Sequence, residues 1–173
     1  FYRFLMLASL IVMASFSHAN NGISLLSATE KDKAVGNVEI ILQQQGKRSI
    51  SRFSDDQGAV IIPEEFDSDE TTAIFKKDGF STFITKCPCN GLTYALSETM
   101  SSLDGIRIVL TWNNKVRDLD AHLLSSDVHI NHRQKQTGSA RLDVDEIEHW
   151  GPETITVDDV NLAKGTVYYV RDF

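Results

Sequence analysis

Short segments in which apolar and polar residues alternate recur along the chain, with turn residues between them. In the first half, six such segments are rich in apolar and β-branched residues: 38–42, 49–53, 59–62, 71–75, 80–85 and 93–96. Gly, Asp and Asn lie between them, and Pro63 ends the third, because proline cannot donate to a β-ladder. Short strands at this spacing are typical of a small β-sandwich. No segment keeps a helical period.

The second half continues the pattern. Ile106, Ile108, Leu110 and Trp112 occupy alternate positions and therefore share one face of an extended segment. Four further segments read as extended: 118–123, 142–145, 154–157 and 167–173. We therefore predict an all-β protein made of two small β-sandwich domains in tandem, residues 20–100 and 101–173. Because the last segment reads as a strand without a following turn, we expect the second domain to be incomplete at Phe173.

Residues 1–19 have the form of a secretory signal peptide. Residues 4–16 are almost wholly apolar, and Ser17-His18-Ala19 places small residues where a signal peptidase cleaves. The apolar run is too short to cross about 30 Å of hydrocarbon as a helix. We therefore expect a periplasmic or secreted protein with a cleaved signal peptide and no integral membrane segment.

Composition narrows the classes of partner. The 173 residues carry a formal net charge of −7 at pH 7, whereas nucleic-acid binders need a basic stripe. We therefore expect no nucleic-acid partner. Hydrophobic residues make up 42% of the chain and charged residues 24%. Both shares are ordinary for a globular protein, so composition gives no reason to expect a disordered or fibrous chain.

Carboxylates gather in the second half as two Asp-x-Asp pairs. In an extended segment Asp118, Asp120 and His122 lie on one face, and Asp143 and Asp145 repeat the alternation. Like charges in one site call for a counter-ion, and Ca²⁺ accepts six to eight oxygen ligands in loose geometry. We therefore predict a site for Ca²⁺, or another divalent cation, at these five residues. His122 suits zinc, manganese or iron better, and strand faces also carry charges without any ion.

Three further residues lie near these pairs in the sequence. Glu153 follows the bend at Gly151-Pro152 and either joins the carboxylates or belongs to the turn before the strand 154–157. His129 and His132 also alternate, but no carboxylate lies in register with them. We therefore expect both imidazoles to be solvated.

Cys87-Pro88-Cys89 contains both cysteines of the chain. Three interpretations are open: a strained redox-active disulfide, two free thiols that bind a soft metal, or a local staple or buried small residues. Thioredoxin-like chemistry needs Cys-x-x-Cys at the start of a helix, and neither is present. This favours the structural interpretation.

Two resemblances add to this picture. Residues 35–40, 54–58 and 77–80 resemble the carboxypeptidase regulatory-like (transthyretin-like) sandwiches, which are accessory domains. The order of Leu110-Thr111-Trp112, 118–123, 142–145, 151–155 and 165–170 resembles the YfaP-like family of uncharacterised exported bacterial proteins. The second resemblance covers about residues 103–173. It implies a β-rich module whose two Asp-rich elements belong together, and it implies no established activity.

Three functions are compatible with these patterns. The first is a non-catalytic binding or interaction module of the cell envelope, with an unidentified envelope protein or glycan as partner. The second is a metal-dependent hydrolase with Glu153 as general base, although no nucleophile motif is present. The third is a carbohydrate-binding module, for which Trp112 and Trp150 are the candidate stacking platforms. The first fits best, because the sequence contains no catalytic constellation.

Overall fold

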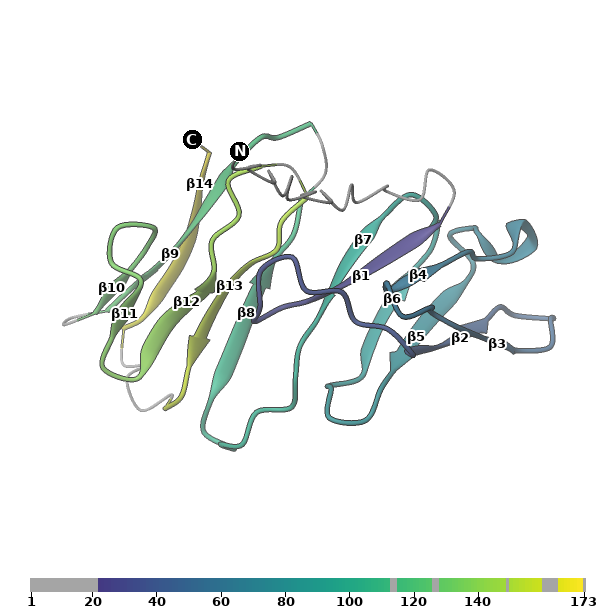
Figure 1. Cartoon of the computed structure of the whole chain (residues 1–173), viewed down its shortest axis with the longest axis horizontal. Coiled ribbons are helices and arrows are strands. Elements are labelled where there is room, and N and C mark those ends of the chain that lie inside the picture. The colour runs from purple at the N-terminus through teal and green to yellow at the C-terminus, as the bar shows by residue number, and fades with distance from the viewer. Residues whose placement is uncertain (1–21, 113–114, 126–127, 149, 160–164, 173) are drawn as a thin grey trace, which may run out of the picture.

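The computed structural model describes residues 22–112, 115–125, 128–148, 150–159 and 165–172, and within these ranges the chain is all-β, as predicted (Figure 1). The predicted signal peptide, residues 1–19, and the turn predicted at residues 113–114 lie outside the described residues. No helix in the described ranges has both the length and the apolar character needed to cross a membrane.

The first part of the chain forms two sheets. The strands of the smaller sheet run in the order β4 (Ala59–Val60), β1 (Ile23–Ser27) and β7 (Thr93–Leu96). The strands of the larger sheet run in the order β3 (Ile50–Phe53), β2 (Glu39–Gln43), β5 (Thr72–Lys76) and β6 (Phe83–Lys86). A 3₁₀ turn, η1 (Glu64–Phe66), lies between β4 and β5. The pairing of β1 with β7 is parallel and the other pairings are antiparallel.

The second part also forms two sheets, on the left of Figure 1. One has the order β11 (Gln136–Thr137), β12 (Ala140–Val144), β13 (Glu153–Val157) and β8 (Ile106–Leu110). The other has the order β10 (His129–Ile130), β9 (Leu119–Leu124) and β14 (Val167–Asp172). All pairings in these two sheets are antiparallel.

Each pair of sheets encloses one hydrophobic cluster. The first cluster takes its side chains from β1, β2, β4, β5 and β7, and Phe75, Phe83 and Tyr94 pack as a triangle with ring centroids 5.4–5.5 Å apart. The second takes its side chains from both sheets of the second part, with Leu123 and Ile155 among its buried members. The boundary predicted between residues 100 and 101 falls between the two clusters, and the division into two domains stays a prediction.

Four elements were not predicted: β1, η1, β10 and β11. Ile23, Leu25 and Ser27 of β1 alternate and are buried, but the adjacent Leu25-Leu26 pair hides that alternation in the sequence. Strands β10 and β11 have only two residues each, too few to show a period. The hairpin that contains β10 nevertheless brings two histidines to β9, with consequences described below.

Candidate metal centre

Three carboxylates converge in the second part of the chain. Asp120 lies in β9, Asp145 directly follows β12, and Glu153 begins β13. One oxygen from each lies within 4.8 Å of the other two. Asp120 is 4% exposed and Glu153 is completely buried. The group therefore combines residues from both sheets in a place that bulk water barely reaches.

Glu153 connects the two sheets. Its side chain is on the face of β13 that also carries Ile155 and Val157, which belong to the second hydrophobic cluster. Its Oε1 accepts a hydrogen bond from the backbone N–H of Ala121 in β9, with a donor–acceptor distance of 3.0 Å. This contact holds one carboxylate oxygen beside Asp120 and leaves the other, Oε2, for a further partner.

Two acidic residues of this region, Glu153 and Asp118, have raised pKa values. Burial raises the pKa of Glu153 to about 8, and the charges of Asp145, Asp120 and Asp118 add to this effect, against the hydrogen bond from Ala121. Burial, followed by the charges of Asp120 and Asp145, also raises the pKa of Asp118. Asp118, which directly precedes β9, is therefore close enough to the converging carboxylates for their charges to act on it.

The negative charge is only partly compensated. Nζ of Lys135 lies 2.6 Å from Oδ2 of Asp145, and Nδ1 of His132 lies 2.9 Å from Oδ1 of Asp120. Among the described residues, Oδ2 of Asp120 and Oε2 of Glu153 are buried and have no hydrogen-bond partner. A buried carboxylate oxygen without a partner is costly, so this group favours either a proton, consistent with the raised pKa of Glu153, or a bound cation.

The structure separates Asp143 from Asp145. Cα pairing between β12 and β13 shifts by one residue between Leu142 and Val144, which is a β-bulge. Asp143 accepts a hydrogen bond from Nε of Arg141, 2.9 Å away, and lies on the face opposite to Leu142. The extra residue returns Asp145 to the face that carries Glu153. Strict alternation therefore placed Asp143 in the predicted ligand set, whereas the bulge keeps it out of the converging group.

His122 is not a member of the converging group. Its ring stacks on Tyr169 of β14, with centroids 4.6 Å apart and planes 8° apart, and its Nδ1 lies 3.1 Å from Nε2 of His129. Burial and the neighbouring His129 lower the pKa of His122. Of the five predicted ligands, Asp120 and Asp145 converge with Glu153. Asp118 is close enough for the charges of Asp120 and Asp145 to raise its pKa. His122 and Asp143 contact other groups.

The prediction that His129 and His132 are solvated holds only in part: both are half-buried, and both have partners. His132 is paired with Asp120, and His129 contacts His122. Both contacts depend on the β9–β10 hairpin, in which His129 pairs with Leu124 across the strands. Lys135, which pairs with Asp145, carried no pattern in the sequence that distinguishes it from a surface lysine.

The loop 146–152 joins two members of the site, Asp145 and Glu153. Gly151 has a φ of 66°, and a Cβ on it would lie 2.9 Å from the Trp112 ring and 3.0 Å from the backbone oxygen of Leu110. Trp112 and Trp150 are both half-buried. The indole of Trp112 lies against Gly151, two residues before Glu153 in the chain.

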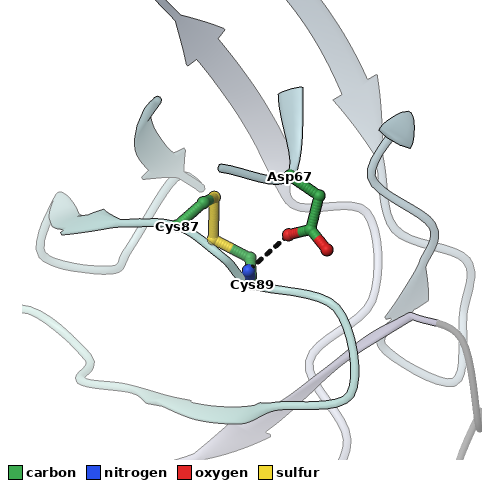
Figure 2. Close-up of side chains that lie close together, drawn as sticks. All are labelled: Asp67, Cys87 and Cys89. Atoms are coloured by element: carbon green, nitrogen blue, oxygen red, sulfur yellow. Dashed lines mark hydrogen bonds between the residues drawn. A yellow bond between two sulfur atoms is a disulfide. The ribbon is translucent and has the colours of Figure 1, made fainter. Parts of the chain in front are cut away.

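Asp67, Cys87 and Cys89 form a second cluster of potential ligands, in the first part of the chain (Figure 2). The two sulfurs are bonded to each other, so the interpretation as two free thiols that bind a metal is wrong. Both cysteines are buried in the first hydrophobic cluster, and Asp67 accepts the backbone N–H of Cys89 at 2.5 Å. The contacts support a local staple, because a buried disulfide is shielded from attacking thiolates.

Comparison of the chain with protein-family models, with curated proteins and with solved structures finds no match.

Proposed function

We propose that this protein is a non-catalytic binding module of the bacterial cell envelope whose second part binds one divalent cation, preferably Ca²⁺. The ligands are Asp120, Asp145 and Glu153, with Asp118 contributing negative charge at the rim. The observation that carries the proposal is the convergence of three carboxylates within 4.8 Å, two of them with a buried oxygen that lacks a partner among the described residues. The envelope location rests on the signal-peptide pattern of residues 1–19.

The donor set favours calcium over transition metals. The converging group offers carboxylate oxygens and no nitrogen or sulfur, which is the preference of a hard cation. Because Ca²⁺–oxygen distances are about 2.3–2.6 Å, two ligands on opposite sides of one ion lie about 4.6–5.2 Å apart. Because the three oxygens all lie within 4.8 Å of one another, small movements of the side chains would let all three reach one ion.

No feature of the described site favours the hydrolase alternative. Glu153, the candidate general base, is itself a member of the converging group and is completely buried. A base of a hydrolytic metal site must contact a metal-bound water that also reaches substrate. The role of the ion is therefore structural in this proposal: it joins β9 to the two ends of the loop 146–152.

A thermal-shift titration tests the proposal. Protein stripped with EDTA is melted with increasing Ca²⁺, Mg²⁺, Mn²⁺ or Zn²⁺. Ca²⁺ at about 100 times its dissociation constant should stabilise the fold by about 2.7 kcal/mol. This corresponds to a rise in melting temperature of roughly 5–11 °C for a chain of this size.

Asp145→Asn and Asp143→Asn form a matched pair for this titration. Asp143 is in β12 and Asp145 directly follows it, two residues further on, yet only Asp145 belongs to the converging group. Asp145→Asn should abolish the response to Ca²⁺, and Asp143→Asn should retain it even if its melting temperature without the ion is lower. Equal responses from both variants, or no response from the wild type, would refute the site.

A further inference from the structure

Two histidines lie side by side on the β9–β10 hairpin, outside the group of three carboxylates. His122 is in the middle of β9, and His129 begins β10 and pairs with Leu124. His122 and Leu124 are two residues apart and share a face, so the two histidines are diagonal neighbours on that face of the sheet. Nδ1 of His122 and Nε2 of His129 are 3.1 Å apart.

This separation fits two ligands of one metal ion. Zinc–nitrogen distances are about 2.0–2.1 Å, so two nitrogens at a tetrahedral angle lie about 3.3–3.4 Å apart. The two imidazole nitrogens therefore need to separate only slightly to share an ion. A small rotation of the more exposed ring, that of His129, is enough for this adjustment.

The surroundings of His122 hold its ring in place. The stacked ring of Tyr169 covers one face of the imidazole, at 4.6 Å between centroids. His122 is 7% exposed, and its Nε2 is buried without a hydrogen-bond partner among the described residues. His129 is half-buried. A buried, stacked imidazole thus lies next to a partly exposed one.

The third histidine of the hairpin is engaged elsewhere. Nδ1 of His132 is 2.9 Å from Oδ1 of Asp120, and its Nε2 accepts a hydrogen bond from Nε of Arg133, 3.2 Å away. Both nitrogens of His132 therefore have partners other than the His122–His129 pair. His132 lies between the nitrogen pair and the carboxylates and belongs to the carboxylate side.

We propose that His122 and His129 form a second metal site, for an imidazole-preferring divalent ion such as Zn²⁺ or Ni²⁺. The ligands are Nδ1 of His122 and Nε2 of His129, and water completes the coordination. In the metal-free pair one of these nitrogens carries the shared proton. On binding, that ring takes its other tautomer, so both lone pairs face the ion and no proton is released. The site is distinct from the calcium site, because its donors are nitrogens and it needs none of the three carboxylates.

The experiment is calorimetric titration of the full chain with Ni²⁺ in the presence of saturating Ca²⁺, which keeps the carboxylates occupied. The wild type should bind one Ni²⁺ per chain. His129→Gln, at a half-buried position, should weaken binding by about tenfold or more. His132→Gln, the matched control from the same hairpin, should retain the wild-type affinity within about threefold.

Two results would overturn the proposal. One is Ni²⁺ binding by His129→Gln with the wild-type affinity. The other is a loss in His132→Gln as large as that in His129→Gln, which would assign the ion to the carboxylate side. Glu153→Gln distinguishes this site from the proposed function, because it should lose the response to Ca²⁺ and keep the binding of Ni²⁺.

A spectroscopic readout covers the case in which a variant folds poorly. In wild-type protein labelled with ¹⁵N, Zn²⁺ should shift the resonances of Nδ1 of His122 and Nε2 of His129 and leave those of His132 in place. Shifts confined to His132 would contradict the assignment. This measurement needs no substitution and therefore does not depend on the stability of any variant.

Discussion

Replacement of Glu153 by Gln tests the central claim about the carboxylates. Gln keeps an Oε1 acceptor for the N–H of Ala121 and removes the buried ionisable group. The pKa of Glu153 rises from 4.5 to about 8 in the folded chain. In the metal-free protein, between about pH 4.5 and 8 the unfolded state has therefore already lost this proton, whereas the folded state still carries it.

The sign of the effect follows from that difference in bound protons. The stability that Glu153 contributes is fully present below pH 4.5 and is lost as the pH rises to about 8. Each pKa unit corresponds to about 1.4 kcal/mol, so the wild type should lose roughly 3–5 kcal/mol relative to Glu153→Gln over this window. For a chain of this length the loss corresponds to a difference in melting temperature of roughly 10 °C.

The assay is thermal unfolding by circular dichroism in EDTA, from pH 4.5 to pH 9, for the wild type and Glu153→Gln. The difference between the two curves isolates Glu153, because the remaining titrating groups are shared. Glu64→Gln, at an exposed carboxylate of η1, is the control and should follow the wild type at every pH. Ca²⁺ should restore the wild type most strongly above pH 8, where the carboxylate is ionised without competition from a proton.

Parallel curves for the wild type and Glu153→Gln in EDTA would refute the reasoning, since they would mean that Glu153 ionises in the folded chain as it does in the unfolded one. A response of Glu153→Gln to Ca²⁺ equal to that of the wild type would contradict its role as a ligand. The two outcomes are independent, because the first concerns the metal-free protein and the second the ion.

Further predictions concern the scaffold. Phe75 is 1% exposed and packs against two other rings. Phe75→Ala should therefore destabilise the chain by about 3–5 kcal/mol in urea unfolding, and a loss below about 1 kcal/mol would contradict this. At Gly151 a φ of 66° and the indole ring 2.9 Å from a Cβ both oppose a side chain. Gly151→Ala should cost about 2 kcal/mol in the same assay. Gly138 also has a positive φ but has open space around it, so Gly138→Ala is the control for the contact with the indole. An equal loss of stability in both variants would mean that this contact does not oppose a side chain at Gly151. The hydroxyl of Tyr168 is buried without a partner among the described residues. Tyr168→Phe should therefore lower stability by less than about 0.5 kcal/mol or increase it, and a larger loss would reveal a hydrogen bond. A thiol titration of the native protein should find no reactive thiol at Cys87 or Cys89, and two rapidly reacting thiols would contradict the disulfide.

Most of the strands were predictable from the sequence because their faces differ in burial. In β2, for example, Ile40 and Leu42 are buried and their neighbours are not, and this difference produces the alternation that the sequence shows. Strand β13 is different, because all five of its residues are buried and only its β-branched residues marked it as a strand. Period-two reasoning therefore works where one face of a strand is more exposed than the other.

The candidate site was only partly predictable, for two physical reasons. Asp120 and Asp145 were among the predicted ligands, but their meeting with Glu153 depends on how two sheets pack, and no local pattern encodes that packing. The role of His132 depends on a hairpin whose second strand, β10, has only two residues and therefore shows no period. Glu153 was a candidate ligand only because it follows a bend, and its complete burial was not visible in the sequence.

Because of the bulge in β12, the two aspartates of the Leu-Asp-Val-Asp sequence have different structural roles. If Asp143 were deleted, Leu142, Val144 and Asp145 would alternate regularly, and Asp145 would still be on the face that carries Glu153. One of the two aspartates is thus an inserted residue, and the other belongs to the converging group of carboxylates. Related chains that lack the bulge residue would not have the Asp-x-Asp spacing, so a search by that spacing would miss them. A search for an acidic residue opposite the first residue of β13 would find related chains with the bulge and without it.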